Sequence, residues 1–219
     1  QIDQFIKEGV NLLIVSPNQI HTISSVIDKA YDAGIPVILF DRKTDSKKYT
    51  AFIGADNYEA GHEMGLFIAQ QLGGKGSVVE IGGLKGSSPA IERDRGFTEA
   101  LKAYPDIKIV GRYYADWQED RGAAVMDSIL AQGVKIDYVF GQNDRIAAGA
   151  RKLAMQRGEK AIKFVGIDAL PVAGGGMEDV RDGRLVASYI YPTRGDLVMQ
   201  LALNILEKKP FHRDNYLKG

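Results

Sequence analysis

The sequence has 219 residues, and its 28 Lys and Arg balance 28 Asp and Glu, so the formal net charge is zero. This balance argues against nucleic-acid binding, which needs a basic excess or stripe. The absence of cysteine excludes disulfides, thiolate nucleophiles and cysteine-ligated metal sites. The chain is 45% hydrophobic and 26% charged, as expected of a globular protein, and its length suits one large or two small domains.

Short apolar runs recur along the chain and alternate with longer amphipathic stretches. Because the runs are brief and rich in β-branched residues, they are typical of strands buried on both faces of a parallel sheet. The predicted strands cover residues 12–15, 37–40, 52–55, 77–81, 107–110, 138–141, 164–167 and 187–190.

The stretches between these runs have the periodicity of helices that cover a sheet. Apolar stripes at helical spacing lie within residues 20–30, 60–72, 123–130 and 197–206. Regular alternation of strand and helix predicts βαβ units, and therefore an α/β fold with parallel sheets flanked by helices. Gly174–Gly176 interrupt an expected helix start, and they are interpreted either as a loose loop or as a flexible rim of a site.

Polar and aromatic side chains follow the predicted strands. Ligands of open parallel sheets bind beyond the carboxyl ends of the strands, so these residues are expected to share one edge. Asp and Asn accept hydrogen bonds from sugar hydroxyls, Arg donates to them, and aromatic rings stack on sugar C–H faces. The set therefore suits a neutral polyhydroxylated ligand. The candidate ligand-binding residues are Asp41, Arg42, Arg93, Trp117, Asn143, Asp168 and Tyr191.

Six of the seven candidates, all but Tyr191, also have a purely structural interpretation. Asp41, Asn143 and Asp168 follow strands, where Asp and Asn often cap helices. Asp144 is the expected N-cap of a helix that begins near Ile146. The arginines are equally consistent with ion pairs, and a single tryptophan is more often a core residue. The shared position of the candidates is what favours a binding site.

The sequence matches no motif for catalysis, cofactor binding or metal binding. The glycine-rich residues 73–77 precede a strand and lack the Walker spacing. The three histidines are scattered, which argues against a metal site. Asp41, Asp144 and Asp168 offer a carboxylate pair for glycoside hydrolysis, but nothing in the sequence sets their separation. We therefore expect no catalysis, no cofactor and no metal.

Six segments spread over nearly the whole chain carry a family resemblance. They are residues 11–18 (NLLIVSPN), 34–43 (GIPVILFDRK), 53–61 (IGADNYEAG), 86–97 (GSSPAIERDRGF), 139–149 (VFGQNDRIAAG) and 165–168 (VGID). In combination they resemble the ribose-binding-protein-like sugar binders among the type I periplasmic binding proteins. The same fold forms the effector domain of lac-repressor-type regulators and the sensor domain of some membrane histidine kinases.

The resemblance implies two Rossmann-like lobes joined by hinge crossovers, with a sugar held between lobes that close on it. The first lobe is expected to comprise residues 1–55 and 192–212, and the second residues 56–191 and 213–219. Family members begin with a strand, a helix and a second strand that have no counterpart here, roughly 60 residues. The first lobe is therefore expected to be incomplete at its N-terminal side.

The resemblance also assigns the candidates to lobes. Asp41 and Arg42 match first-lobe contacts to sugar hydroxyls, whereas Arg93, Asn143 and Asp168 match second-lobe contacts. Trp117 lies where the family has a stacking aromatic residue. Tyr191 stands near the hinge where ribose binders have Gln, and Ala169 replaces the usual Gly.

The function implied is non-catalytic periplasmic binding of a monosaccharide, a pentose or a hexose such as ribose or fructose. The partner is then a transporter permease in ABC sugar uptake or the kinase module of a two-component sensor, and no nucleic acid is bound. The alternative is the effector-binding domain of a lac-repressor-type transcription regulator.

Overall fold

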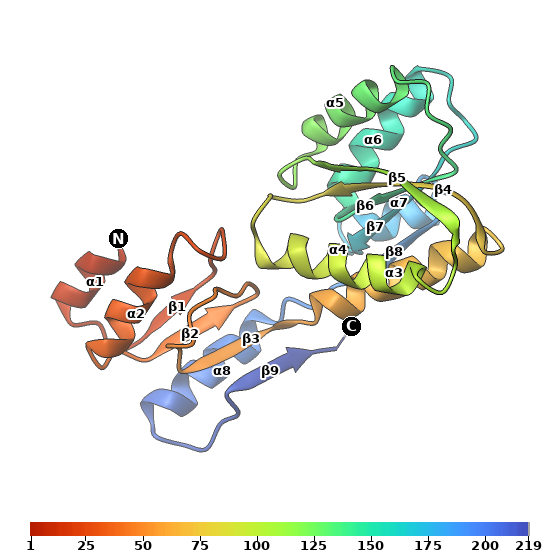
Figure 1. Cartoon of the computed structure of the whole chain (residues 1–219). Helices are drawn as coiled ribbons and strands as arrows, with labels where there is room; N and C mark the ends of the chain where they lie inside the picture. The colour runs from red at the N-terminus through yellow and green to blue at the C-terminus, as the bar shows by residue number, and fades with distance from the viewer. Residues whose placement is uncertain (219) are drawn as a thin grey trace. The chain divides into compact units, whose positions relative to one another are not determined.

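The computed structural model describes residues 1–218, which fold into two compact units. Unit 1 comprises residues 1–56, 86–88 and 192–218, and unit 2 comprises Asn57–Lys85 and Pro89–Tyr191. Each unit contains a parallel sheet with helices packed against it (Figure 1). The α/β class predicted from the alternating pattern is confirmed.

Unit 1 is built on a four-stranded sheet in the order β1-β2-β3-β9, with every pair parallel. Its strands are β1 (Leu13–Val15), β2 (Val37–Phe40), β3 (Ala51–Ala55) and β9 (Asp214–Leu217), and its helices are α1 (Ile2–Glu8), α2 (Ser24–Asp32) and α8 (Gly195–Leu206). Alternate side chains of β2 point to opposite faces of the sheet. Val37 and Leu39 pack in the core that includes α2, whereas Ile38 packs with α8 residues.

The strand β9 corrects one expectation about the lobes. Residues 213–219 were expected in the second lobe, yet Asp214–Leu217 pairs with β3 in the sheet of unit 1, where Phe52 lies opposite Asp214. This strand lies at the edge of the sheet, and its residues are exposed or only half-buried. Its sequence, DNYL, therefore does not need the apolar run that marks a central strand. Gly219, the last residue of the expected segment, lies outside the described residues.

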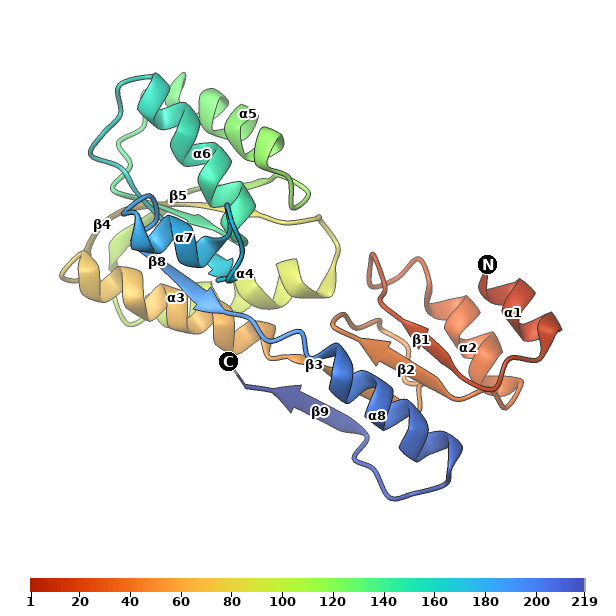
Figure 2. The same ribbon diagram turned by 180° about the vertical axis from the view of Figure 1, so that it is seen from behind.

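Unit 2 is built on a five-stranded parallel sheet in the order β5-β4-β6-β7-β8. Its strands are β4 (Lys75–Gly82), β5 (Asp106–Tyr114), β6 (Tyr138–Gly141), β7 (Lys163–Asp168) and β8 (Ala187–Ile190). Its helices are α3 (Asn57–Gln71), α4 (Ser88–Leu101), α5 (Glu119–Leu130), α6 (Asp144–Gln156) and α7 (Gly176–Arg181). Figure 2 shows α3 and α4 on one face of this sheet and α5 and α6 on the other.

The core of unit 2 joins the central strands to two of these helices. Val79 and Val139 on the strands pack with Met126 and Ile129 of α5 and with Ile146 of α6, all buried. No helix within residues 1–218 is both long and apolar enough to cross a membrane. Across the same residues, no three His, Cys, Asp or Glu side chains gather as metal ligands.

Candidate ligand-binding site

The loops after β4 and β6 meet where the strand order of unit 2 reverses. The chain runs from β4 outward to β5 and then returns past β4 to β6, so the ends of β4 and β6 are neighbours. The side-chain oxygen of Gln142, directly after β6, accepts a hydrogen bond from the Gly83 amide, directly after β4, at 3.0 Å. Such a reversal point is where open parallel sheets bind their ligands.

Arg93 is the central cation at this edge of unit 2. It lies on α4, and only 4% of its surface is exposed. Its Nε donates to Asn57 Oδ1 at 2.9 Å, and its Nη1 donates to the carbonyl oxygen of Gln142. These bonds fix the guanidinium plane, because a fork of donors held at two points cannot rotate.

Two aromatic rings flank the Arg93 guanidinium. Its Cζ lies 5.5 Å from the ring centroid of Trp117 and 4.8 Å from that of Tyr191, distances at which a cation is attracted to a ring face. The Tyr191 hydroxyl accepts from Asn57 Nδ2 at 3.2 Å. The structure therefore brings together three candidates from separate elements: Arg93, Trp117 and Tyr191.

Trp117 is placed by an unusual backbone. Asp116 and Trp117 have φ values of 48° and 67°, in the left-handed region that non-glycine residues rarely adopt. Asp116 forms an ion pair with Arg121 of α5. The Trp117 ring lies against Gly83 so closely that a Cβ atom there would overlap it. Gly83 therefore allows the ring to reach the end of β4.

Asn143 lies beside this cluster and also has a structural role. Its Oδ1 accepts from the Ile146 amide at 3.0 Å as the N-cap of α6, and its Nδ2 lies 3.4 Å from the carbonyl oxygen of Trp117. The N-cap was expected at Asp144, which instead is the first residue of the helix. The cap interpretation considered for Asn143 is therefore correct, and the one for Asp144 is wrong.

Beneath the cluster lies Glu80, a buried carboxyl on the central strand β4. Only 2% of its surface is exposed, and its Oε1 accepts from Gln142 Nε2 at 2.7 Å. Its Oε2 lies 3.3 Å from Nε of Arg112. Burial, with the Asp94 carboxylate nearby, raises the pKa of Glu80 to about 8. Glu80 is therefore largely protonated at neutral pH.

Asp168 ends β7 and lines a cavity of about 260 Å³. The same cavity is lined by Asp144, by Asp179 and by Gly174–Gly176. Gly175 is the N-cap of α7, so the three glycines form the entry to this helix. Because β7 lies beyond β6 in the strand order, Asp168 extends the polar edge of the sheet past Asn143.

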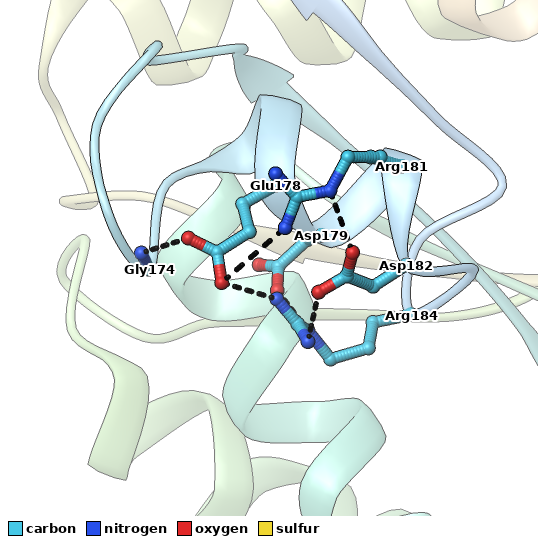
Figure 3. A network of polar contacts seen from close by, with 6 residues as sticks. All are labelled: Gly174, Glu178, Asp179, Arg181, Asp182 and Arg184. Carbon is cyan, nitrogen blue, oxygen red and sulfur yellow. Dashed lines mark hydrogen bonds and ion pairs between the residues drawn. The ribbon is translucent and has the colours of Figure 1, made fainter.

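The entry to α7 is held by a network of charged side chains (Figure 3). Glu178 accepts a hydrogen bond from the Gly174 amide at 2.9 Å and pairs with Arg184. Arg184 also pairs with Asp179 and Asp182. These contacts hold the glycine segment in place, and its three glycines form part of the cavity wall.

The remaining two candidates lie in unit 1. Asp41 follows β2 with a φ of 65°, and its amide donates to the Ile53 carbonyl oxygen at 2.8 Å. Arg42 Nη1 donates to Asn18 Oδ1 at 3.1 Å, and Arg42 Nε lies 3.7 Å from Asp41 Oδ2. Both side chains are partly exposed. A carboxylate, a guanidinium and an amide thus gather beyond β1 and β2.

Sequence reasoning missed Asn57, Gln142 and Glu80 as parts of the site. Asn57 and Gln142 lie within the segments quoted for the family resemblance, and Gln142 directly follows a predicted strand. Glu80 had a clear signal, because it is the single charged residue within an apolar run. A buried charge in a central strand needs partners, which points to a polar network.

Comparison with known proteins assigns the family. A model of the periplasmic binding protein domain matches residues 1–210. The chain belongs to this family. Among curated relatives, the xylitol-binding protein of Mycolicibacterium smegmatis is 29% identical over 93% of this chain. The ribose import binding protein of Escherichia coli is 31% identical over 96% of it.

Solved structures with the same fold are also similar to this chain. The fructose-binding periplasmic domain of a hybrid two-component system is 50% identical, with a TM-score of 0.97 over 99% of this chain. A protein from Mycobacterium smegmatis in complex with β-D-fucofuranose is 33% identical, with a TM-score of 0.91 over 97% of it. This chain spans 58% of the xylitol-binding protein, 67% of the ribose-binding protein, 73% of the fructose-binding domain and 72% of the fucofuranose complex.

Proposed function

We propose that this chain contributes a binding site for a monosaccharide and carries out no catalysis. The observation that carries the proposal is Arg93, a buried guanidinium fixed by Asn57 and Gln142 and flanked by two aromatic rings. Such a group donates to sugar hydroxyls, and the rings pack on sugar C–H faces. The ligands for which related proteins are named, which include ribose, xylitol and fructose, support a neutral polyhydroxylated ligand.

The seven candidates supply three kinds of group that a sugar can contact. Asp41, Asn143 and Asp168 offer acceptors for hydroxyl groups, whereas Arg42 and Arg93 offer donors. Trp117 and Tyr191 supply flat apolar faces. The presence of both acceptors and donors favours a ligand whose hydroxyls both donate and accept hydrogen bonds, and it disfavours an ion.

The proposed setting is the periplasm, with the sugar signal passed to a histidine kinase module. The 50% identity to a periplasmic domain of a hybrid two-component system favours this sensor role. Delivery of sugar to an import permease is the second candidate, because the ribose import binding protein is also similar. The two roles share one ligand chemistry and differ in the partner.

Calorimetric titration of the chain with fructose, ribose, xylitol, glucose and galactose tests the binding function. We expect one saturable response, which Arg93→Ala weakens at least tenfold and the exposed Arg95→Ala leaves unchanged. If the folded chain responds to none of these sugars, the proposal is wrong. If an aryl glycoside is turned over and Asp168→Asn abolishes that turnover, the claim of no catalysis fails.

A further inference from the structure

The backbone at the end of β7 is strained. Asp168 has a φ of 128° and Ala169 a φ of 48°, and neither residue is glycine. Non-glycine residues in these regions persist only where the surrounding structure holds them. The turn formed by these two residues is here called the 168–169 turn, and its backbone sets the direction of the Asp168 Cα–Cβ bond.

The Asp144 carboxylate supplies the contacts that hold the 168–169 turn. The Ala169 amide donates to Asp144 Oδ2 at 2.7 Å and to Ser188 Oγ at 3.0 Å. The Ser188 hydroxyl in turn donates to Asp144 Oδ1 at 2.6 Å. Both oxygens of Asp144 therefore accept hydrogen bonds, one directly from the turn and one from a side chain on β8 that also binds the turn.

Two glycines make room for this carboxylate. Asp144 is only 5% exposed, and a Cβ atom at either Gly166 or Gly176 would overlap its carboxyl group. Gly166 lies on β7 and Gly176 begins α7. The space is therefore matched to a short carboxylate that enters from α6, and a longer side chain at position 144 does not fit.

We propose that Asp144 is the positioning residue for Asp168: it fixes the 168–169 turn and thereby the direction of the Asp168 carboxylate. This inference rests on the proposed function, in which Asp168 accepts a hydrogen bond from a sugar hydroxyl. Asp144 acts through Asp168 and has no ligand contact assigned to it.

The ionisation of Asp144 makes the role measurable. Burial raises the pKa of Asp144 to about 6, and the bonds from Ser188 and Ala169 oppose this rise. The charged groups around it are Asp179 on α7, Arg93 on α4, Glu119 on α5, Arg145 on α6 and Asp168 on β7. Protonation turns one acceptor oxygen into a donor, so one of the two bonds is lost and the turn loosens as the pH falls below 6.

The first experiment follows the Ala169 amide by NMR in the ligand-free chain between pH 4.5 and 8. In the wild type its chemical shift is expected to titrate with a midpoint near 6, and in Asp144→Asn it is expected to stay flat. Asp120→Asn, in the first turn of α5 and exposed, is the matched control and keeps the wild-type titration. If Asp144→Asn does not fold, Ser188→Ala replaces it, and loss of this bond should move the midpoint upward.

The second experiment measures the affinity for the sugar identified by the titration panel at pH 5 and pH 7.5. The wild type should bind at least threefold more weakly at pH 5, and Asp144→Asn should lose at least tenfold at pH 7.5 and show no pH dependence. An Ala169 amide that does not titrate overturns the inference, as does a wild-type pH profile in the variant. If no sugar binds the wild type, the proposed function fails, and the amide titration still decides whether Asp144 holds the turn.

Discussion

The hydroxyl group of Tyr191 accepts a hydrogen bond from Asn57 Nδ2 at 3.2 Å, and this bond joins the first and last residues of unit 2. Asn57 uses its oxygen at the same time to hold Nε of Arg93. Tyr191 therefore does two things at once. Its ring lies over the Arg93 guanidinium. Its hydroxyl holds the Asn57 side-chain amide, which in turn orients the guanidinium.

Tyr191→Phe separates these two contributions. The ring stays over Arg93 while Asn57 loses a buried partner, so we expect the free energy of unfolding to fall by about 1 kcal/mol. Urea denaturation followed by circular dichroism measures the change. Tyr114→Phe, at an exposed position, is the control and should leave the midpoint unchanged. Equal midpoints for both variants would contradict a structural role of the hydroxyl.

Arg93→Lys tests the fixed guanidinium. An ammonium group keeps the charge, but it lacks the planar fork that binds Asn57 and the Gln142 carbonyl at once and stacks on aromatic rings. We expect sugar affinity to fall at least tenfold, which is about 1.4 kcal/mol. Calorimetry measures it, with Arg95→Lys as the exposed control. Wild-type affinity in Arg93→Lys would show that charge alone is sufficient.

Gly83→Ala tests the position of the Trp117 ring. The added Cβ overlaps the ring, so the ring must move away from the end of β4. Because Trp117 is the single tryptophan of the sequence, its emission reports this displacement directly, and we expect a red shift before any sugar is added. Gly195→Ala, where the new Cβ meets nothing within 4 Å, should leave the emission unchanged. An unshifted spectrum in Gly83→Ala would argue against the close contact.

Glu80→Gln tests the protonated state of the buried carboxyl. The fold raises the pKa of Glu80 to about 8 from an ordinary value of 4.5, so between these values the folded state binds more protons than the unfolded state. The free energy of unfolding contributed by Glu80 therefore falls as pH rises through this window, by at most about 1.4 kcal/mol per pH unit.

Gln is neutral at every pH, so Glu80→Gln removes this loss. The variant and the wild type should have similar stabilities near pH 4.5, and the variant should be the more stable at pH 8. Denaturant titrations at the two pH values measure the difference, with the exposed Glu99→Gln as control. Parallel pH profiles for wild type and Glu80→Gln would mean that Glu80 is ionised in the fold.

The strands buried on both faces were predictable because apolar runs such as Val37–Phe40 leave no alternative to a central strand. The strand β9 was not, since Asp214 and Asn215 give it the composition of a loop and its place is decided by the free edge of β3. The N-cap of α6 was misassigned by one residue because Asn143 and Asp144 are both good caps. In the structure the Asp144 side chain lies in the buried space next to Gly166, so Asn143 is the residue that caps the helix.

The polar edge of unit 2 was predictable from the residues directly after each strand, but its internal contacts were not. Arg93, Asn57 and Tyr191 are far apart in the chain, and no periodicity relates them. The roles of Glu80 and Asp144 depend on burial and on bonds to residues of other elements, which a single sequence does not reveal. The ligand roles of all seven candidates, Arg93, Trp117 and Tyr191 included, stay predictions until sugar binding is measured.

The pairing of β9 with β3 has a consequence for the order of folding. All of unit 2 lies in the chain between these two strands, so during synthesis its sheet is complete before β9 has been made. Domains fold as units in the order in which they emerge. Unit 2 therefore folds first, and unit 1, although its first three strands precede unit 2 in the chain, gains β9 only after unit 2 has been synthesised.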